Sequence, residues 1–330
     1  MSSLSAGAAA YRLSATAMEE ASRLGQRIAD IDHLFLALTL DEQVTGQILR
    51  KSGITIEKAR AAVAAQHKVQ LASLGIDFDM PTIQKISFGE TAGYEWSPRA
   101  LNLLTEAQKK GGGSATILQE LVQEPSGFMA EILGRLGTSA QQILDDLAQA
   151  QLSQEPSYSP ASFSYNHRAI SAKSSFFIPA DPQPIWDLLS DPERLPVWNP
   201  VWESVTAEPG RPLSEPGWLL TATPPTRRNG KPFGKSRRGY HYRSQLSVEQ
   251  VSQQLSWIFT PLNKRANRRE LTFTLRPVSE GSQLDIQVSW VKSQQRRPLS
   301  FLHPVLRPVY RFLLPLQLAQ VANSISRIFR

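Results

Sequence analysis

The sequence contains no cysteine. This absence excludes disulfide bonds, thiolate nucleophiles and cysteine-ligated zinc sites, and it fits a reducing compartment. No run approaches the roughly 20 apolar residues that a membrane-spanning helix needs. The first ten residues carry no basic segment of the kind that opens a secretory signal. We therefore expect a cytoplasmic protein without a metal ion or a cofactor.

Familiar catalytic motifs are missing too. Neither H-E-x-x-H nor G-x-S-x-G occurs anywhere in the chain. Residues 230–236 (GKPFGKS) imitate a phosphate-binding loop, but such a loop needs four residues between its glycines, and three stand between Gly230 and Gly234. One of them is proline, which has no N–H to offer a phosphate. We interpret the segment as a basic loop and find no ATPase motif.

Charge divides the chain into two unlike halves. The chain has 330 residues, and because a typical domain has about 150, we expect roughly two domains. Residues 1–158 hold 13 Lys and Arg against 18 Asp and Glu, a balance of −5. Residues 159–330 hold 23 against 11, a balance of +12. An acidic half joined to a basic half indicates two surfaces with different partners.

The acidic half contains a duplication. Residues 18–25 align with residues 104–111 at an offset of 86, and residues 48–53 align with residues 132–137 at an offset of 84. The copies then differ by one two-residue deletion. A duplicated helical pattern predicts a small two-repeat module, with about four short helices per repeat, that holds a partner rather than catalysing a reaction.

The first copy resembles the amino-terminal domain of Clp ATPases, the double-repeat module that receives adaptors and substrates. The matching segments are 20–25, 31–38 (IDHLFLAL) and 48–54. The family usually carries Glu-His-Leu-Leu where residues 32–35 (DHLF) stand, and the second copy departs from it with Leu118 in the aligned slot. The resemblance covers residues 10–150. It implies a protein partner, such as a Clp-type protease component or its substrates.

Asp32 and His33 are the candidate partner-binding residues of this module. In some members of the family, an acidic residue at this slot of each repeat takes part in binding basic or arginine-phosphorylated substrates. Here Leu118 replaces the second acid, which argues against a paired site. The simpler interpretation of Asp32 is a helix N-cap. The simpler interpretation of His33 is a hydrogen-bonded structural histidine, because no other ligand stands at metal-binding spacing.

The basic half has the pattern of an α+β domain. Residues 151–165 are rich in Ser and Pro and predict a linker. Alternating apolar residues in 271–275 and 284–290, separated by 280–282, predict a β-hairpin. We expect further strands at 169–178, 239–242 and 255–259. Helices are expected at 180–189, at 192–195 and, as a long apolar and basic helix, at about 305–329.

The opening of this half resembles the START-like polyketide cyclase/dehydrase (SRPBCC) superfamily, which has a helix-grip fold. The matching residues are 177–182 (FIPADP) and 185–200 (IWDLLSDPERLPVWNP). The resemblance implies a curved antiparallel sheet that grips a long C-terminal helix over residues 166–330. It also implies a cavity for an apolar ligand such as a lipid, sterol or polyketide.

Aromatic residues are concentrated in the same half, and aromatic side chains supply large, rigid walls for a ligand site. For any single tryptophan, packing in the core is the simpler interpretation. The candidate cavity residues are Trp186, Trp198, Trp202, Tyr240, Tyr242, Trp257, Phe259 and Trp290.

Basic residues form two clusters that we expect to lie in loops between strands. They are Arg227, Arg228, Lys235, Arg237, Arg238, Lys264, Arg265, Arg268 and Arg269. Three interpretations are open. The clusters form solvated loops, they bind an anionic membrane surface, or they bind nucleic acid, which no motif supports.

The sequence thus predicts two domains, residues 1–150 and 166–330, joined by the linker at 151–165. We expect a non-enzymatic protein that binds an apolar small molecule in the second domain and a protein partner through the first. One alternative is a cyclase or dehydratase, for which the nearby acid–base candidates are Asp187, Asp285, His241 and Tyr242. The other alternative is a peripheral membrane lipid-transfer protein.

Overall fold

The computed structural model describes residues 3–77, 86, 93–153, 162–165, 169–199, 202, 204–207, 219–223, 242–249, 254–261, 267–292 and 303–330. The chain divides into two compact units. We name them the helical unit, within residues 1–159, and the sheet unit, within residues 160–329.

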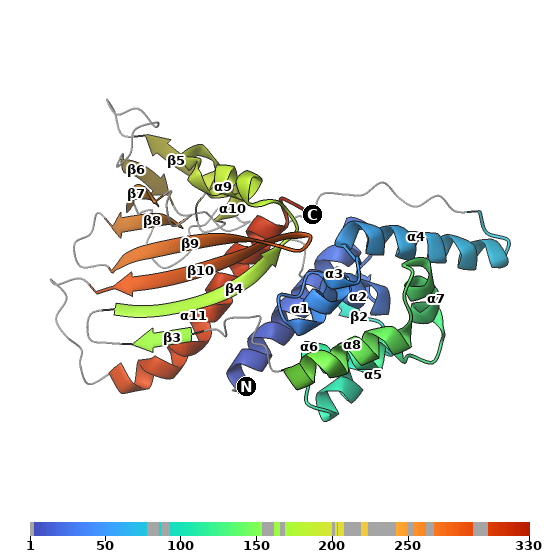
Figure 1. Ribbon diagram of the computed structural model, residues 1–330. Helices are drawn as coiled ribbons and strands as arrows, with labels where there is room; N and C mark the ends of the chain where they lie inside the picture. Colours follow the sequence, from blue (N-terminus) through green and yellow to red (C-terminus); the bar gives the residue numbers. More distant parts are fainter. Residues whose placement is uncertain are drawn as a thin grey trace. The chain divides into compact units, whose positions relative to one another are not determined.

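The helical unit consists of two four-helix repeats (Figure 1), which confirms the prediction of a duplicated all-α module. The first repeat holds α1 (Ser3–Arg23), α2 (Ile31–Thr39), α3 (Val44–Lys51) and α4 (Ile56–Ser73). The second holds α5 (Pro98–Lys109), α6 (Ser114–Val122), α7 (Phe128–Arg135) and α8 (Ala140–Ser153). The repeats are joined by two short parallel strands, β1 (Ile28–Ala29) and β2 (Glu95–Trp96).

The helix starts correct the alignment of the two copies. The ends of α1 and α5 are offset by 86 residues, the starts of α2 and α6 by 83, and the starts of α3 and α7 by 84. Leu118 therefore corresponds to Phe35, and both are fully buried. The counterpart of Asp32 is Ala115. The second copy does lack the acid. However, the predicted counterpart, Leu118, was wrong by three residues, because the second copy has a shorter connection before α6 and a slightly longer one after it.

The sheet unit is an eight-stranded antiparallel sheet with a long C-terminal helix, which confirms the predicted helix-grip class. The strand order is β3-β4-β10-β9-β8-β7-β6-β5. The strands are β3 (Ser162–Tyr165), β4 (Ala169–Ile178), β5 (Ser204–Ala207), β6 (Leu219–Thr223), β7 (Tyr242–Glu249), β8 (Gln254–Pro261), β9 (Arg268–Val278) and β10 (Gly281–Val291). The helices are α9 (Pro182–Ser190), a 3₁₀ turn η2 (Pro192–Arg194), α10 (Leu195–Trp198) and α11 (His303–Ser326).

The predicted linker is shorter than expected at both ends. Helix α8 continues to Ser153, and strand β3 begins at Ser162 and pairs with β4. The strands β5 and β6 were not predicted either. Residues 239–241 of one expected strand lie outside the described residues, and β7 begins at the next residue, Tyr242.

The core of the sheet unit lies between one face of the sheet and α11. Alternation places Leu271, Phe273 and Leu275 of β9 on this inward face, where all are buried. Helix α11 crosses the sheet in Figure 1 and packs on β4 and β10, with Leu314 and Leu318 buried in the same core. Each such side chain contributes about 1.5–3 kcal/mol through burial. No helix in the described part of the chain is long and apolar enough to cross a membrane.

Candidate functional site

Aromatic rings line the inward face of the sheet unit. Trp198, Trp257 and Phe259 are completely buried, and Trp202 nearly so. The ring centroids of Trp198 and Trp257 lie 6.3 Å apart, and those of Trp202 and Phe259 lie 5.4 Å apart in a stacked pair. Trp198 also meets Phe273 edge-on at 5.4 Å. Four of the eight predicted wall residues thus contact one another inside the unit.

The other four predicted wall residues are either less buried or outside the described part of the chain. Trp186 and Trp290 are half-buried and pack against the margin of the core. Tyr240 lies outside the described residues, as does the side chain of Tyr242, the first residue of β7.

Several buried polar atoms in this interior have no hydrogen-bond partner among the described residues. They are Nε1 of Trp198, Nε1 of Trp290, and both Oδ1 and Nδ2 of Asn199. Asn199 is completely buried directly after α10. Leaving a buried donor or acceptor unpaired costs about 1–3 kcal/mol. Atoms of this kind are usually satisfied by an ordered water or by a polar group of a ligand. Asn199 was not predicted as a site residue, because its burial follows from tertiary packing.

Two neighbouring arginines of β9 lie on opposite faces of the sheet, and this corrects the expected basic surface. Arg268 is exposed. Arg269 shares the inward face with Leu271 and is half-buried. Both belong to the strand, so they do not lie in a loop as expected. The remaining seven basic residues lie outside the described residues, and their membrane or solvent role stays a prediction: Arg227, Arg228, Lys235, Arg237, Arg238, Lys264 and Arg265.

The acids considered for the enzymatic alternative lie away from this interior. Asp285 alternates with Leu284 and Ile286 of the core, so its carboxylate lies on the outward face. There it accepts a hydrogen bond from Ser175 Oγ at 2.5 Å and one from Arg276 at 2.8 Å. Asp187 is exposed and accepts from the Gln183 amide at 2.7 Å. His241 lies outside the described residues.

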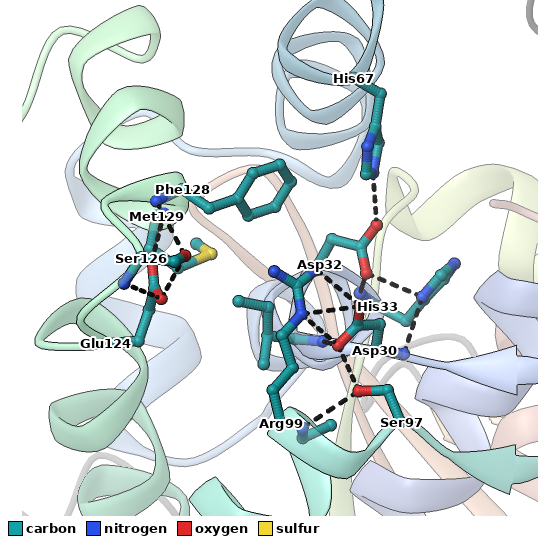
Figure 2. Close-up of polar contacts among 12 residues, drawn as sticks. Asp30, Asp32, His33, His67, Ser97, Arg99, Glu124, Ser126, Phe128 and Met129 are labelled. Carbon is teal, nitrogen blue, oxygen red and sulfur yellow. Dashed lines mark hydrogen bonds and ion pairs between the residues drawn. The ribbon is translucent and has the colours of Figure 1, made fainter. Parts of the chain in front are cut away.

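In the helical unit, an acidic cluster connects the two repeats (Figure 2). Asp30 is the N-cap of α2, and its Oδ1 accepts from the N–H of Ile31 at 2.8 Å. Arg99 donates through Nε to both carboxylate oxygens of Asp30, at 2.7 and 2.8 Å, and Ser97 donates through Oγ at 2.5 Å. Both donors come from the start of α5 in the second repeat. The cap is therefore Asp30, and the expectation that Asp32 caps the helix was wrong.

Asp32 lies in the first turn of α2, beneath two histidines. Its Oδ1 is 2.9 Å from Nδ1 of His33, and its Oδ2 is 2.8 Å from Nε2 of His67 on α4. Burial opposes ionisation of Asp32, but the hydrogen bonds from His33 and His67 outweigh it and hold the pKa of Asp32 far below its ordinary value. His67 was not predicted, because 35 residues separate it from Asp32.

The proton of His33 can serve only one of two neighbours. Nδ1 also lies 3.1 Å from the backbone nitrogen of Asp30, an arrangement that would require Nδ1 to accept. Nε2 is buried without a partner among the described residues. A proton on Nδ1 forms a charge-assisted bond to Asp32, whereas a proton on Nε2 would be buried without an acceptor. With the proton on Nε2, Nδ1 accepts from the Asp30 N–H and closes the capping box of α2; with the proton on Nδ1, His33 instead supports the Asp32 carboxylate.

The exposed surface of this cluster is formed by other residues than those predicted. The side chains of Asp32 and His33 are only 4% and 2% exposed, whereas those of His67 and Arg99 are 29% and 43% exposed. The His67 ring packs on Phe128 at 5.1 Å, and the Arg99 guanidinium lies 5.3 Å from the centre of the same ring. Figure 2 shows Phe128 entering from α7. In the described part of the chain, no group of three His, Asp or Glu residues could hold a metal ion.

No protein-family model matches the chain, and no curated protein matches it. Similar solved structures include the N-terminal domain of the caseinolytic-protease-associated chaperone ClpD from Arabidopsis thaliana, which is 21% identical, with 43% of this chain and 94% of that chain covered and a TM-score of 0.33. They also include the di-domain aromatase/cyclase StfQ from the steffimycin biosynthetic pathway, 12% identical, with 58% of each chain covered and a TM-score of 0.36. The ZhuI aromatase/cyclase from Streptomyces sp. R1128 is 9% identical, with 48% and 96% covered and a TM-score of 0.33. These belong to the two groups that the sequence resembles.

Proposed function

We propose that the chain is a non-enzymatic two-domain protein. The sheet unit binds an apolar small molecule of the lipid or polyketide class between its sheet and α11. The helical unit binds a protein partner through its Clp-type repeats. One chain would then bind both a small molecule and a protein partner.

The unpaired polar atoms of the sheet interior carry the first half of this proposal. Asn199 places an amide oxygen and an amide nitrogen in a completely buried position, and the preceding residue, Trp198, adds a buried indole N–H; none of the three has a partner among the described residues. The surrounding rings of Trp257, Phe259 and Phe273 supply apolar surface. A mainly apolar molecule with one or two polar groups satisfies both features at once.

Organic extraction of the purified full chain, followed by mass spectrometry, tests ligand binding. We expect a co-purified apolar compound at a substantial fraction of one equivalent. The matched variant is Asn199→Leu, which keeps the branched shape of the side chain and removes both amide atoms. Extracts that contain no such compound, from a protein that also ignores added lipids, would remove the proposal.

The contacts of His67 and Arg99 with Phe128 support the proposal that the helical unit binds a protein partner. They join residues of both repeats at one place, where His67 and Arg99 are accessible and Asp32 fixes the position of His67. A partner that contacts His67 and Arg99 would therefore touch both repeats.

Affinity capture with the full chain tests this contact. Arg99→Gln and His67→Gln are compared with Lys109→Gln, an exposed cation of α5 that pairs with Glu106 outside the cluster. We expect the partner retained by the wild type and by Lys109→Gln to be lost in the two cluster variants. Equal retention by all four proteins would place the partner surface elsewhere.

A further inference from the structure

The main chain fixes the position of Asn199, which is completely buried in the sheet unit. Asn199 directly follows α10 and has an extended backbone conformation, with φ −118° and ψ 90°. Its backbone N–H donates to the carbonyl oxygen of Leu195 at 3.0 Å, and its own carbonyl oxygen accepts from the N–H of Trp202 at 3.1 Å. Both backbone groups of Asn199 are therefore hydrogen-bonded within the unit.

The tryptophans that flank Asn199 in the chain pack into the apolar core. Trp198 meets Phe273 of β9 edge-on at 5.4 Å, and Trp202 stacks on Phe259 of β8 at 5.4 Å. Both indoles belong to the buried core of the sheet unit. Asn199 thus lies in a short segment that is anchored on aromatic side chains of the sheet.

The side-chain amide of Asn199 has no hydrogen-bond partner among the described residues, at either Oδ1 or Nδ2. An amide presents one acceptor and two N–H donors whichever way it is turned. Burying these atoms without partners opposes folding, whereas an apolar side chain at this position would not. A group that complements the amide must donate to its oxygen and accept from its nitrogen.

Few polar groups can do both. A carboxylate or an ester accepts but does not donate, so it would leave the oxygen of Asn199 unpaired. An ammonium donates but does not accept, and it would leave the nitrogen unpaired. An ion is also costly to bury among aromatic side chains. A carboxamide has a donor next to an acceptor, and it can pair with the asparagine amide through two hydrogen bonds.

We propose that the ligand of the sheet unit carries a neutral group with a hydrogen-bond donor next to an acceptor, such as a carboxamide, and that Asn199 binds this group through both atoms of its amide. The proposal rests on the proposed ligand-binding function and names the polar group of the ligand. The rings that pack around Phe259 and Phe273 contact its apolar part.

Titration of the delipidated full chain with decanamide and with methyl decanoate, followed by tryptophan fluorescence, tests the proposal. The probes share a tail and a carbonyl oxygen, but only the amide has N–H donors. Each affinity is compared with the partition of the same probe between water and cyclohexane, in which nothing can hydrogen-bond. We expect the wild type to favour decanamide at least about tenfold more than this partition predicts, which is the scale of one buried hydrogen bond.

Two variants assign the effect to Asn199. Asn199→Leu should lower the affinity for decanamide at least about tenfold more than the affinity for methyl decanoate. Gln320→Leu removes an exposed amide of α11 and should bind both probes as the wild type does.

The outcomes separate the polar group from ligand binding itself. A wild-type preference no greater than partition predicts would overturn the carboxamide proposal while leaving apolar ligand binding intact. An equal preference in the wild type and in Asn199→Leu would overturn it too. If neither probe binds the wild type, the proposed ligand-binding function itself fails. The wild-type comparison needs no variant, so it decides the question even if Asn199→Leu does not fold.

Discussion

Trp198 and Trp257 are both completely buried, with ring centroids 6.3 Å apart, yet their indole N–H groups differ. Nε1 of Trp257 donates to the carbonyl oxygen of Leu189 at 2.9 Å and joins the sheet to α9. Nε1 of Trp198 has no partner among the described residues. One indole N–H thus joins two elements of the fold, and the other has no such role among the described residues.

Substitution by phenylalanine should separate these two roles. Trp257→Phe leaves the Leu189 oxygen unpaired, and we expect a loss of about 1–3 kcal/mol beyond the loss of packing. Trp198→Phe removes a donor that has no partner among the described residues, and it should cost less than Trp257→Phe by about that amount. Urea unfolding of the ligand-free variants measures the difference. Equal destabilisation, or a larger loss in Trp198→Phe, would contradict the assignment.

Asp41, between α2 and α3, predicts a stability that depends on pH. Burial and the neighbouring charge of Glu42 raise the pKa of the Asp41 carboxyl to about 7. The unfolded chain releases this proton near pH 4, so the folded state holds more protons between the two values. The contribution of Asp41 to the free energy of unfolding therefore falls as pH rises from about 4 to 7, by at most about 1.4 kcal/mol per pH unit, and is constant above.

Asp41→Asn keeps the shape of the side chain and removes the ionisation. We expect the variant to lose less stability than the wild type between pH 5 and pH 8, followed at 222 nm in urea. Asp145→Asn, an exposed change on α8, serves as the control and should follow the wild type. Parallel pH profiles of the wild type and Asp41→Asn would show that Asp41 ionises in its ordinary range.

The bond between His67 and Asp32 predicts a loss of stability when the histidine is removed. His67→Ala leaves Oδ2 of the buried Asp32 carboxylate without its partner, and we expect a cost of about 2 kcal/mol. His67→Gln keeps a donor at this position and should cost less. The lowered pKa of Asp32 adds stability above pH 4 that is lost as the pH falls below it, so Asp32→Asn should show a smaller acid effect. Similar losses in both His67 variants would mean that the bond contributes little.

Gly46 of α3 should tolerate no larger side chain. A Cβ atom there would stand 1.9 Å from the carbonyl oxygen of Asp41, which is backbone and cannot move aside cheaply. We expect Gly46→Ala to destabilise the helical unit by about 3 kcal/mol. Gly134→Ala on α7, where a Cβ meets open space, should be neutral or stabilising by about 0.5–1 kcal/mol. Thermal unfolding by circular dichroism measures both, and equal melting temperatures would contradict the argument.

Elements with a strong apolar period could be predicted from the sequence. Strand β4 has the predicted bounds, and the β9–β10 hairpin follows the alternation of its apolar residues. The four residues of β3 are too few to show a period next to a Ser- and Pro-rich stretch. The repeats were recognised, but their register was not, because compensating changes in loop length leave the overall offset nearly constant.

The candidate sites depended on contacts that spacing does not reveal. Arg268 and Arg269 look alike in a run of basic residues, and the strand register alone decides which one enters the interior. Asp32 could be singled out by its family slot, but its partner His67 is 35 residues away on another helix. The burial of Asn199 likewise follows from how α10 packs in the unit.

Native mass spectrometry of the intact full chain, before and after incubation with decanamide, tests most directly whether the sheet unit holds a ligand. The account predicts a second mass, heavier by one ligand, in the wild type and a marked loss of this species in Asn199→Leu. A wild-type protein that shows its bare mass under both conditions would contradict the central claim.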